Sequence, residues 1–337
     1  MLLNMISCLV ACAITASAFA QGMDKPGPDE SLRINEAREN KKSDDAPKGT
    51  AGAADSGGNK AELEAIKKKA IRYSVLFAVP VNTYVVSLLT WDWGRTTKFR
   101  FSHEGWFSRN TYSGGADKAA HLFSFYAIMR ILYNIYDYTE DGAPVKWAYS
   151  AGLSTFLALG IEIGDGFCKN QNGFSIADLT MGFIGIGIGS LLELFPAVDA
   201  FMSLSAEYYP TKYFRKHPQR LKWFLDDYSG WRFMANIKLA GFRYVGVKVP
   251  EFMRYIMFDV GYYTHDYTRY DYRHAEIGRY VEGGFKKRRE IFIGVSINMM
   301  EVVKDFFTDK EGFACRALQQ PFKYYHVPAG VRHGFTL

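Results

Sequence analysis

Four apolar runs fill the middle of this 337-residue chain, and they restrict its possible folds more than any other feature. Each run is close to the roughly 20 residues that an α-helix needs to cross a bilayer. Basic residues flank the first run on both sides and Arg130 lies within the second, so the charges fix no orientation. The runs predict four helices side by side, in or against a membrane, at residues 70–91, 117–136, 145–162 and 175–195.

Two features inside these runs concern helix geometry. Pro80 removes a backbone donor from the first helix and is expected to kink it. Gly185 and Gly189 are four residues apart in the last helix, so they share one face and permit close contact with a neighbouring helix.

The pattern changes after Pro210, where apolar and polar residues begin to alternate. Alternation at residues 231–239 and 290–299 is typical of half-buried strands, and residues 255–263 and 324–335 are expected to form further strands. Four to six strands are fewer than the roughly eight that a transmembrane β-barrel needs. The expected fold is α+β: a four-helix membrane-associated bundle at residues 61–208, followed by a C-terminal antiparallel β-sheet or partial barrel at 209–337.

The N-terminal 20 residues are typical of a signal peptide, because they are apolar or small and Ala18-Phe19-Ala20 fits a cleavage site. Cys12 ends a segment that resembles a bacterial lipobox and is the alternative site of processing; we favour cleavage after Ala20. Either cut exports the chain to the cell envelope. We expect it to be membrane-associated and periplasm-facing, in the inner or the outer membrane.

Residues 21–60 contain almost no large apolar side chain and are expected to form a disordered linker. Cleavage after Ala20 leaves only Cys168 and Cys315, which do not make a disulfide framework. The net charge is +6, with scattered basic residues and no basic stripe with interleaved aromatics, so no nucleic acid partner is expected. The expected partner is a membrane lipid or a cell-wall component, and the pattern defines neither a cofactor nor an oligomeric state.

Ionisable residues gather at the ends of three successive predicted helices. Asp117 and His121 share a face at the start of one helix, and Glu162 and Asp165 share a face at the end of the next. Asp178 lies three residues after Ser175, as in a variant capping box. Acids at a helix C-terminus oppose its dipole, so they need a partner such as Lys118, Arg130 or a cation. We therefore expect Asp117, His121, Glu162 and Asp165 to converge, with Asp178 at the edge.

Two interpretations of this polar centre stay open. In the structural one, Asp117 favours its helix dipole, Ser175 and Asp178 cap a helix, and the acids form ion pairs. In the functional one, His121 is a general base or a ligand, and the carboxylates of Glu162, Asp165 and Asp178 are acids, bases or metal ligands.

Three segments carry a family resemblance. They are GADKAAH at residues 115–121, GIEIGDGF at 160–167 and GFSIADL at 173–179, followed downstream by YPTKY at 209–213 and FLDDYSG at 224–230. Together they resemble the YfiM-like envelope lipoproteins, a family of unknown function, over residues 91–337. The chain is more distantly similar to VanZ-like membrane proteins. The family usually has Asn four residues after Asp178, where this chain has Gly182. The resemblance implies a helical envelope domain and brings no established activity.

The leading hypothesis is an envelope protein that binds, organises or protects a lipid or cell-wall component. The rival is an envelope hydrolase or transferase that uses the Asp-His-Glu-Asp centre on an amphiphilic substrate. A third hypothesis is proton or small-ion handling by the buried acids. No nucleophile-elbow, zinc-protease or P-loop motif selects a reaction.

Overall fold

The structure is a computed structural model. It describes residues 55–337 except 91–92, 95, 97, 104, 110, 140–141, 169–172, 217–226, 268–286 and 311. The expected signal peptide, Cys12 and most of the expected linker lie outside the described residues.

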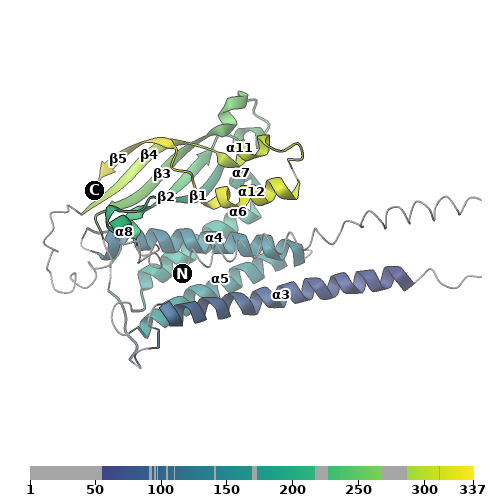
Figure 1. The fold of residues 1–337 in the computed structure, drawn as a ribbon, viewed down its shortest axis with the longest axis horizontal. Helices are drawn as coiled ribbons and strands as arrows, with labels where there is room; N and C mark the ends of the chain where they lie inside the picture. The colour runs from purple at the N-terminus through teal and green to yellow at the C-terminus, as the bar shows by residue number, and fades with distance from the viewer. Residues whose placement is uncertain are drawn as a thin grey trace, which may run out of the picture.

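Four long helices form the first part of the described chain: α3 (Asp55–Thr90), α4 (Ala116–Thr139), α5 (Ala143–Gly166) and α6 (Ile176–Leu194). They lie side by side, with the sheet on one side of α4 (Figure 1). Helix α3 begins at Asp55, within the expected linker, and continues through Pro80. The polar, helix-favouring residues before Ala70 extend this helix beyond its apolar run.

Helix α4 is central, because it contacts α3, α5, α6 and the first three strands. Tyr126, Ile128, Met129 and Leu132 are fully buried along it. The expected close approach of two helices is confirmed at Gly185 of α6, where an added Cβ would lie 2.1 Å from the carbonyl oxygen of Leu122 in α4.

Five antiparallel strands follow, in the order β1-β2-β3-β4-β5. Their bounds are Met202–Tyr208, Trp231–Lys238, Ile256–His265, Arg288–Ile297 and Gly330–Thr336. The α+β class and the antiparallel sheet are confirmed, with β2, β3 and β4 close to the expected positions.

Two boundaries differ from the sequence-based expectation. Strand β1 lies inside the segment 61–208 expected to be helical, because apolar residues from Met202 to Tyr208 alternate with Ser203, Ser205 and Glu207. Tyr324 ends a helix, and the last strand begins only at Gly330.

Short helices connect these elements. They are η2 (Tyr112–Gly115), α7 (Pro196–Phe201), α8 (Lys212–Lys216), η4 (Tyr228–Gly230), α9 (Gly241–Tyr244), η5 (Glu251–Tyr255), α11 (Met299–Asp305) and α12 (Phe313–Tyr324).

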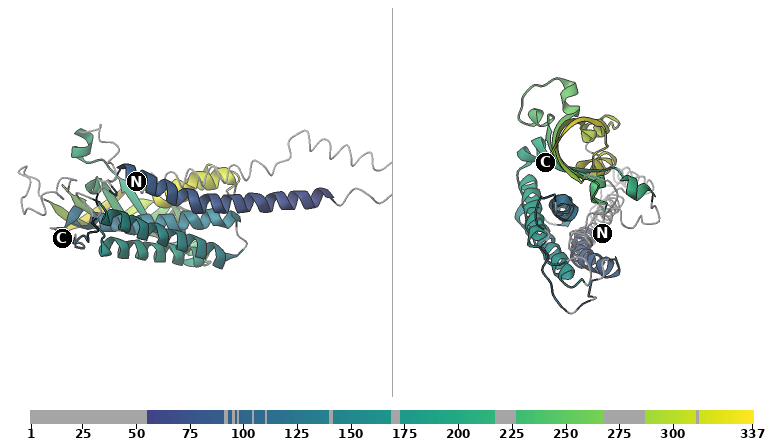
Figure 2. Two further views of the ribbon diagram at one scale, coloured as in Figure 1. Left: turned by 90° about the horizontal axis from the view of Figure 1, so that it is seen from below. Right: turned by 90° about the vertical axis from the view of Figure 1, so that its left-hand side faces the viewer.

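The sheet is strongly curled, as the view along the strands shows (Figure 2). Arg332 of the last strand donates to Glu207 of the first, with Nη2 2.7 Å from Oε2. Residues from the two ends of the sheet therefore meet across its concave face. The outer edge of β1 is also bonded, because the His326 N–H donates to the Ala206 carbonyl at 2.9 Å.

Candidate functional site

The start of α4 is held by the preceding 3-10 turn. Ser113 has a positive φ of 51°, and its hydroxyl donates to Asp117 Oδ1 at 2.8 Å. The Asp117 N–H donates back to Ser113 Oγ at 3.0 Å. Asp117 is thereby fixed in the first turn of α4, where the helix dipole favours its charge.

Lys118 is the central cation of the site. Its side chain is 1% exposed, and Nζ lies 2.7 Å from Asp117 Oδ2 and 2.8 Å from Asp178 Oδ1. This double ion pair joins the start of α4 to the start of α6. Since both carboxylates are buried as well, loss of the lysine would leave uncompensated charge in the interior.

The end of α5 is joined to the start of α6 through Ser175. Its N–H donates to Glu162 Oε2 at 2.9 Å, and its hydroxyl accepts from the Asp178 N–H at 3.2 Å. The expected N-cap role of Ser175 is confirmed. Glu162 therefore finds a donor at the positive end of α6, which offsets its unfavourable position near the end of α5.

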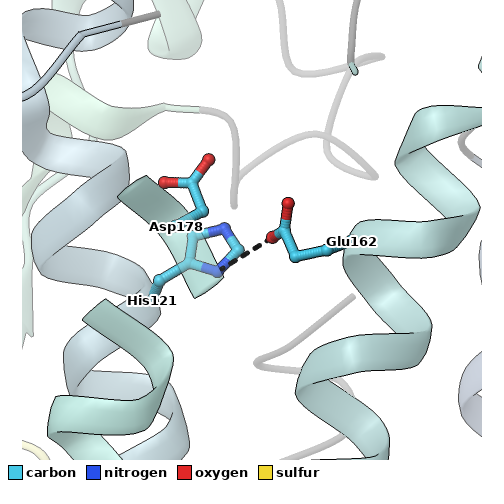
Figure 3. A group of neighbouring side chains, drawn as sticks. All are labelled: His121, Glu162 and Asp178. Atoms are coloured by element: carbon cyan, nitrogen blue, oxygen red, sulfur yellow. Dashed lines mark ion pairs between the residues drawn. The ribbon is translucent and has the colours of Figure 1, made fainter. Parts of the chain in front are cut away.

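His121 lies between the carboxylates of Glu162 and Asp178 (Figure 3). Its Nδ1 is 3.8 Å from Glu162 Oε1, which is an ion-pair distance too long for a hydrogen bond. One possible metal-ligand atom from each of His121, Glu162 and Asp178 lies within 4.8 Å of the other two. The His121 side chain is 20% exposed, whereas Glu162 is almost fully buried. His121 is thus the accessible member of the group, and its buried Nδ1 has no hydrogen-bond partner among the described residues.

Asp165 takes a different position from the one expected. Its Oδ1 accepts from the indole N–H of Trp93 at 2.7 Å, and it is not part of the group around His121. The Trp93 ring packs directly against Gly164, where a Cβ would lie 2.5 Å from it. The structure therefore brings His121 and Glu162 together with Asp178, which lies in the centre of the group and not at its edge. Asp117 is joined to this group through Lys118, and Asp165 lies outside it.

The group carries more acid than base. Asp117, Glu162 and Asp178 are three buried carboxylates, while Lys118 is the one lysine paired with them among the described side chains. A protonated His121 or a bound cation would reduce this excess. An imidazole with two carboxylates is also a usual nitrogen-and-oxygen ligand set for a divalent transition metal. Chemically, the arrangement can act as a base with an orienting acid or as a cation site.

Sequence reasoning missed two residues that build this region, Ser113 and Trp93. Ser113 carries a local signal, because it lies four residues before Asp117 near a helix start. Trp93 carries none, since it is 72 residues from the Asp165 that it binds. Arg130, which was considered as a partner for the acids of α5, instead binds Glu193 and Asp199.

One family model matches part of this chain. It is described as a predicted periplasmic lipoprotein (DUF2279), a domain of unknown function, and it covers residues 103–194. That range holds all five sequence-predicted site residues and ends before the sheet. The description agrees with export to the cell envelope and with a membrane-associated, periplasm-facing location. No curated protein and no solved structure matches the chain.

Proposed function

We propose that this chain is an envelope protein that lies in a membrane through α3, α5 and α6 and binds the polar head of an amphiphile, a lipid or cell-wall component, against His121. The resemblance to YfiM-like and VanZ-like proteins supports the helical envelope domain.

The observation that carries the proposal is the polarity of the helices. Charged residues are buried between them, among them Lys118, Glu162 and Asp178. Large apolar side chains lie on their outer surfaces: Phe77, Val81 and Leu89 on α3, Phe156 and Ile163 on α5, and Ile176 and Leu191 on α6. A helical layer that buries charged residues within its core and exposes large apolar side chains suits a hydrocarbon surrounding better than water.

Helix length supports the same location. Ala61–Leu89 and Ile176–Leu194 are long and apolar enough to cross a membrane. In the 18-residue apolar stretch of each helix, 17% and 33% of the residues, respectively, are buried within the protein. Most of each stretch therefore faces outward, unlike the core helix of a water-soluble domain.

His121→Ala is expected to release the bound amphiphile while leaving the fold intact. The imidazole is partly exposed, and its buried Nδ1 makes no hydrogen bond with the described residues, so its removal eliminates the exposed contact to the ligand without breaking a hydrogen bond at Nδ1. We expect a loss of about tenfold or more in lipid retained after purification in mild detergent, which corresponds to roughly 1.4 kcal/mol. Mass spectrometry of the extracted lipid measures it.

His265→Ala is the matched control. His265 is also partly exposed and lies 3.1 Å from a glutamate, Glu290, but it belongs to the sheet. This variant should retain the amphiphile. Equal retention in both variants would argue against binding at His121. A fall in melting temperature of His121→Ala, with lipid lost only in proportion to folded protein, would favour purely structural pairing.

The second candidate function is an envelope hydrolase or transferase with an amphiphilic substrate. It is favoured by the 3.8 Å separation of His121 Nδ1 from Glu162 Oε1, which leaves the imidazole able to accept a proton next to a carboxylate. Turnover of a lipid ester or phosphoester by the wild type, lost in His121→Gln, would select this function over binding alone.

A further inference from the structure

One face of the sheet is apolar, and it is exposed from β3 to β5, whereas Phe233 of β2 on the same face is buried against Phe123 of α4. The register places Ile237, Phe258, Val295 and Val331 across neighbouring strands, and Val260 beside Ile293. The exposed fractions of Phe258, Val260, Ile293 and Val331 are 46%, 51%, 50% and 82%. Together with Ile291, Ile297 and Phe335, these side chains form an apolar surface on the outer side of the curled sheet. This surface is called here the convex face.

The opposite, concave face is buried, and it carries a polar network beside the apolar side chains of Met234, Met257 and Phe292. Ser205 Oγ donates to Asn236 Oδ1, and Asn236 Nδ2 donates to Asp259 Oδ1, each at 2.7 Å. Glu207 accepts from Arg232 and from Arg332, which bridges the two ends of the sheet. These residues share one side of the sheet, because their positions alternate with those of the convex face.

The exposed apolar face departs from the usual arrangement. In a sheet of a water-soluble domain the apolar face is buried and the polar face is solvated. In strands that face lipid, side chains alternate between apolar outward and polar inward positions. The curled sheet has exposed apolar side chains on one face and buried ion pairs on the other, as in the second pattern.

The dimensions of the convex face also suit a bilayer. Strands β3 and β4 have 10 residues each, within the range of about 9–11 for a membrane-crossing strand. The apolar band from Ile256 to Tyr262 rises by about 20 Å at the usual spacing of a strand. It ends at Tyr262, which packs against Phe107, and exposed Arg288 and half-buried Lys287 lie beyond it, as suits a basic border with anionic headgroups.

We infer that the convex face of the sheet lies against the hydrocarbon of a lipid bilayer, so that the sheet is embedded as well as the helices. This inference rests on the proposed membrane location and extends it from α3, α5 and α6 to β3, β4 and β5. The outer edge of β5 has no neighbouring strand in the part of the chain that the structure describes. An open strand edge is costly in hydrocarbon. The alternative is therefore that a second copy of the chain, and not lipid, covers the convex face.

Single nitroxide labels at Val260→Cys and Ile293→Cys test the inference. The full-length chain is placed in vesicles of phosphatidylethanolamine and phosphatidylglycerol, and label collisions with oxygen and with a water-soluble nickel chelate are measured. The parent chain carries Cys8→Ala and Cys12→Ala, so that only the buried Cys168 and Cys315 remain, and its residual labelling gives the background. Lys310→Cys, at an exposed position between α11 and α12, is the aqueous control. Phe156→Cys, on the outer surface of α5, reports on the helices.

Both convex labels are expected to lose collisions with the nickel chelate and gain collisions with oxygen, relative to the label at Lys310. Ready access of the nickel chelate would overturn the inference, since the face would then be in water. Loss of collisions with both reagents would also overturn it and would indicate a second copy. If the label at Phe156 alone shows lipid contact, the membrane location of the helices stands while the inference about the sheet fails.

Discussion

Replacement of Arg130 by Met is expected to destabilise the protein by about 3 kcal/mol, at the low end of the range for breaking a buried ion pair. The guanidinium is 1% exposed on α4, and it lies 2.5 Å from Glu193 Oε1 and 2.8 Å from Asp199 Oδ1. Methionine keeps much of the volume but leaves both acids with weaker partners. Thermal or denaturant unfolding in detergent measures the change.

Two lysines moderate this effect. Lys323 lies 3.3 Å from Glu193, and Lys238 lies 3.8 Å from Asp199. Burial lowers the pKa of Lys323, and the nearby Arg130 lowers it further. Removing Arg130 therefore favours the charged form of this lysine, which partly compensates Glu193.

Arg243→Met is the matched control for Arg130. Arg243 also pairs with an acid, Glu251, but the two side chains are 37% and 70% exposed. Water screens an exposed pair, so it contributes little to stability and this variant should unfold almost like the parent. Equal stability of the two variants would show that the buried charges contribute no more than the surface pair.

Gly185→Ala is expected to cost about 3 kcal/mol or to prevent folding. The added methyl would lie 2.1 Å from the Leu122 carbonyl oxygen and 2.9 Å from the Tyr126 nitrogen. These are backbone atoms of α4, so the methyl cannot be accommodated by rotating a side chain. Helices α4 and α6 would have to separate, at the cost of contacts throughout their interface.

Gly187→Ala, on the same helix, should act in the opposite direction. A Cβ at Gly187 meets nothing within 4 Å. Alanine is favoured over glycine in a helix by roughly 0.5–1 kcal/mol, so this variant should be slightly stabilised. Melting temperatures of the two variants in the same detergent compare them directly, and similar values would contradict the close packing of α4 on α6.

Much of the fold follows from local patterns in the sequence. The apolar runs predicted the four long helices, and alternation predicted β2, β3 and β4. Strand β1 was missed because its seven residues directly follow the helical segment, although Met202–Tyr208 alternates clearly. The polarity of the two faces of the sheet could not be assigned in advance, because alternation alone does not show which face is buried.

The polar centre was predictable only in part. The spacing of Asp117 and His121, and the cap at Ser175, are local features of a helix, and the structure has both. The choice of partners is not local. Asp165 binds Trp93 and Glu162 binds the Ser175 N–H through the packing of separate segments, which spacing along the chain does not encode.

The central claim is that the apolar outer surfaces of this protein face lipid, and extraction of membranes with alkaline carbonate tests it most directly. The measurement is made on the full chain carrying Cys12→Ala, so that no lipid attached at that residue can act as an anchor. We expect the protein to remain in the membrane pellet and to need detergent for release, because α3, α5 and α6 present large apolar side chains outward. Recovery of the folded protein in the soluble periplasmic fraction without detergent would contradict the account.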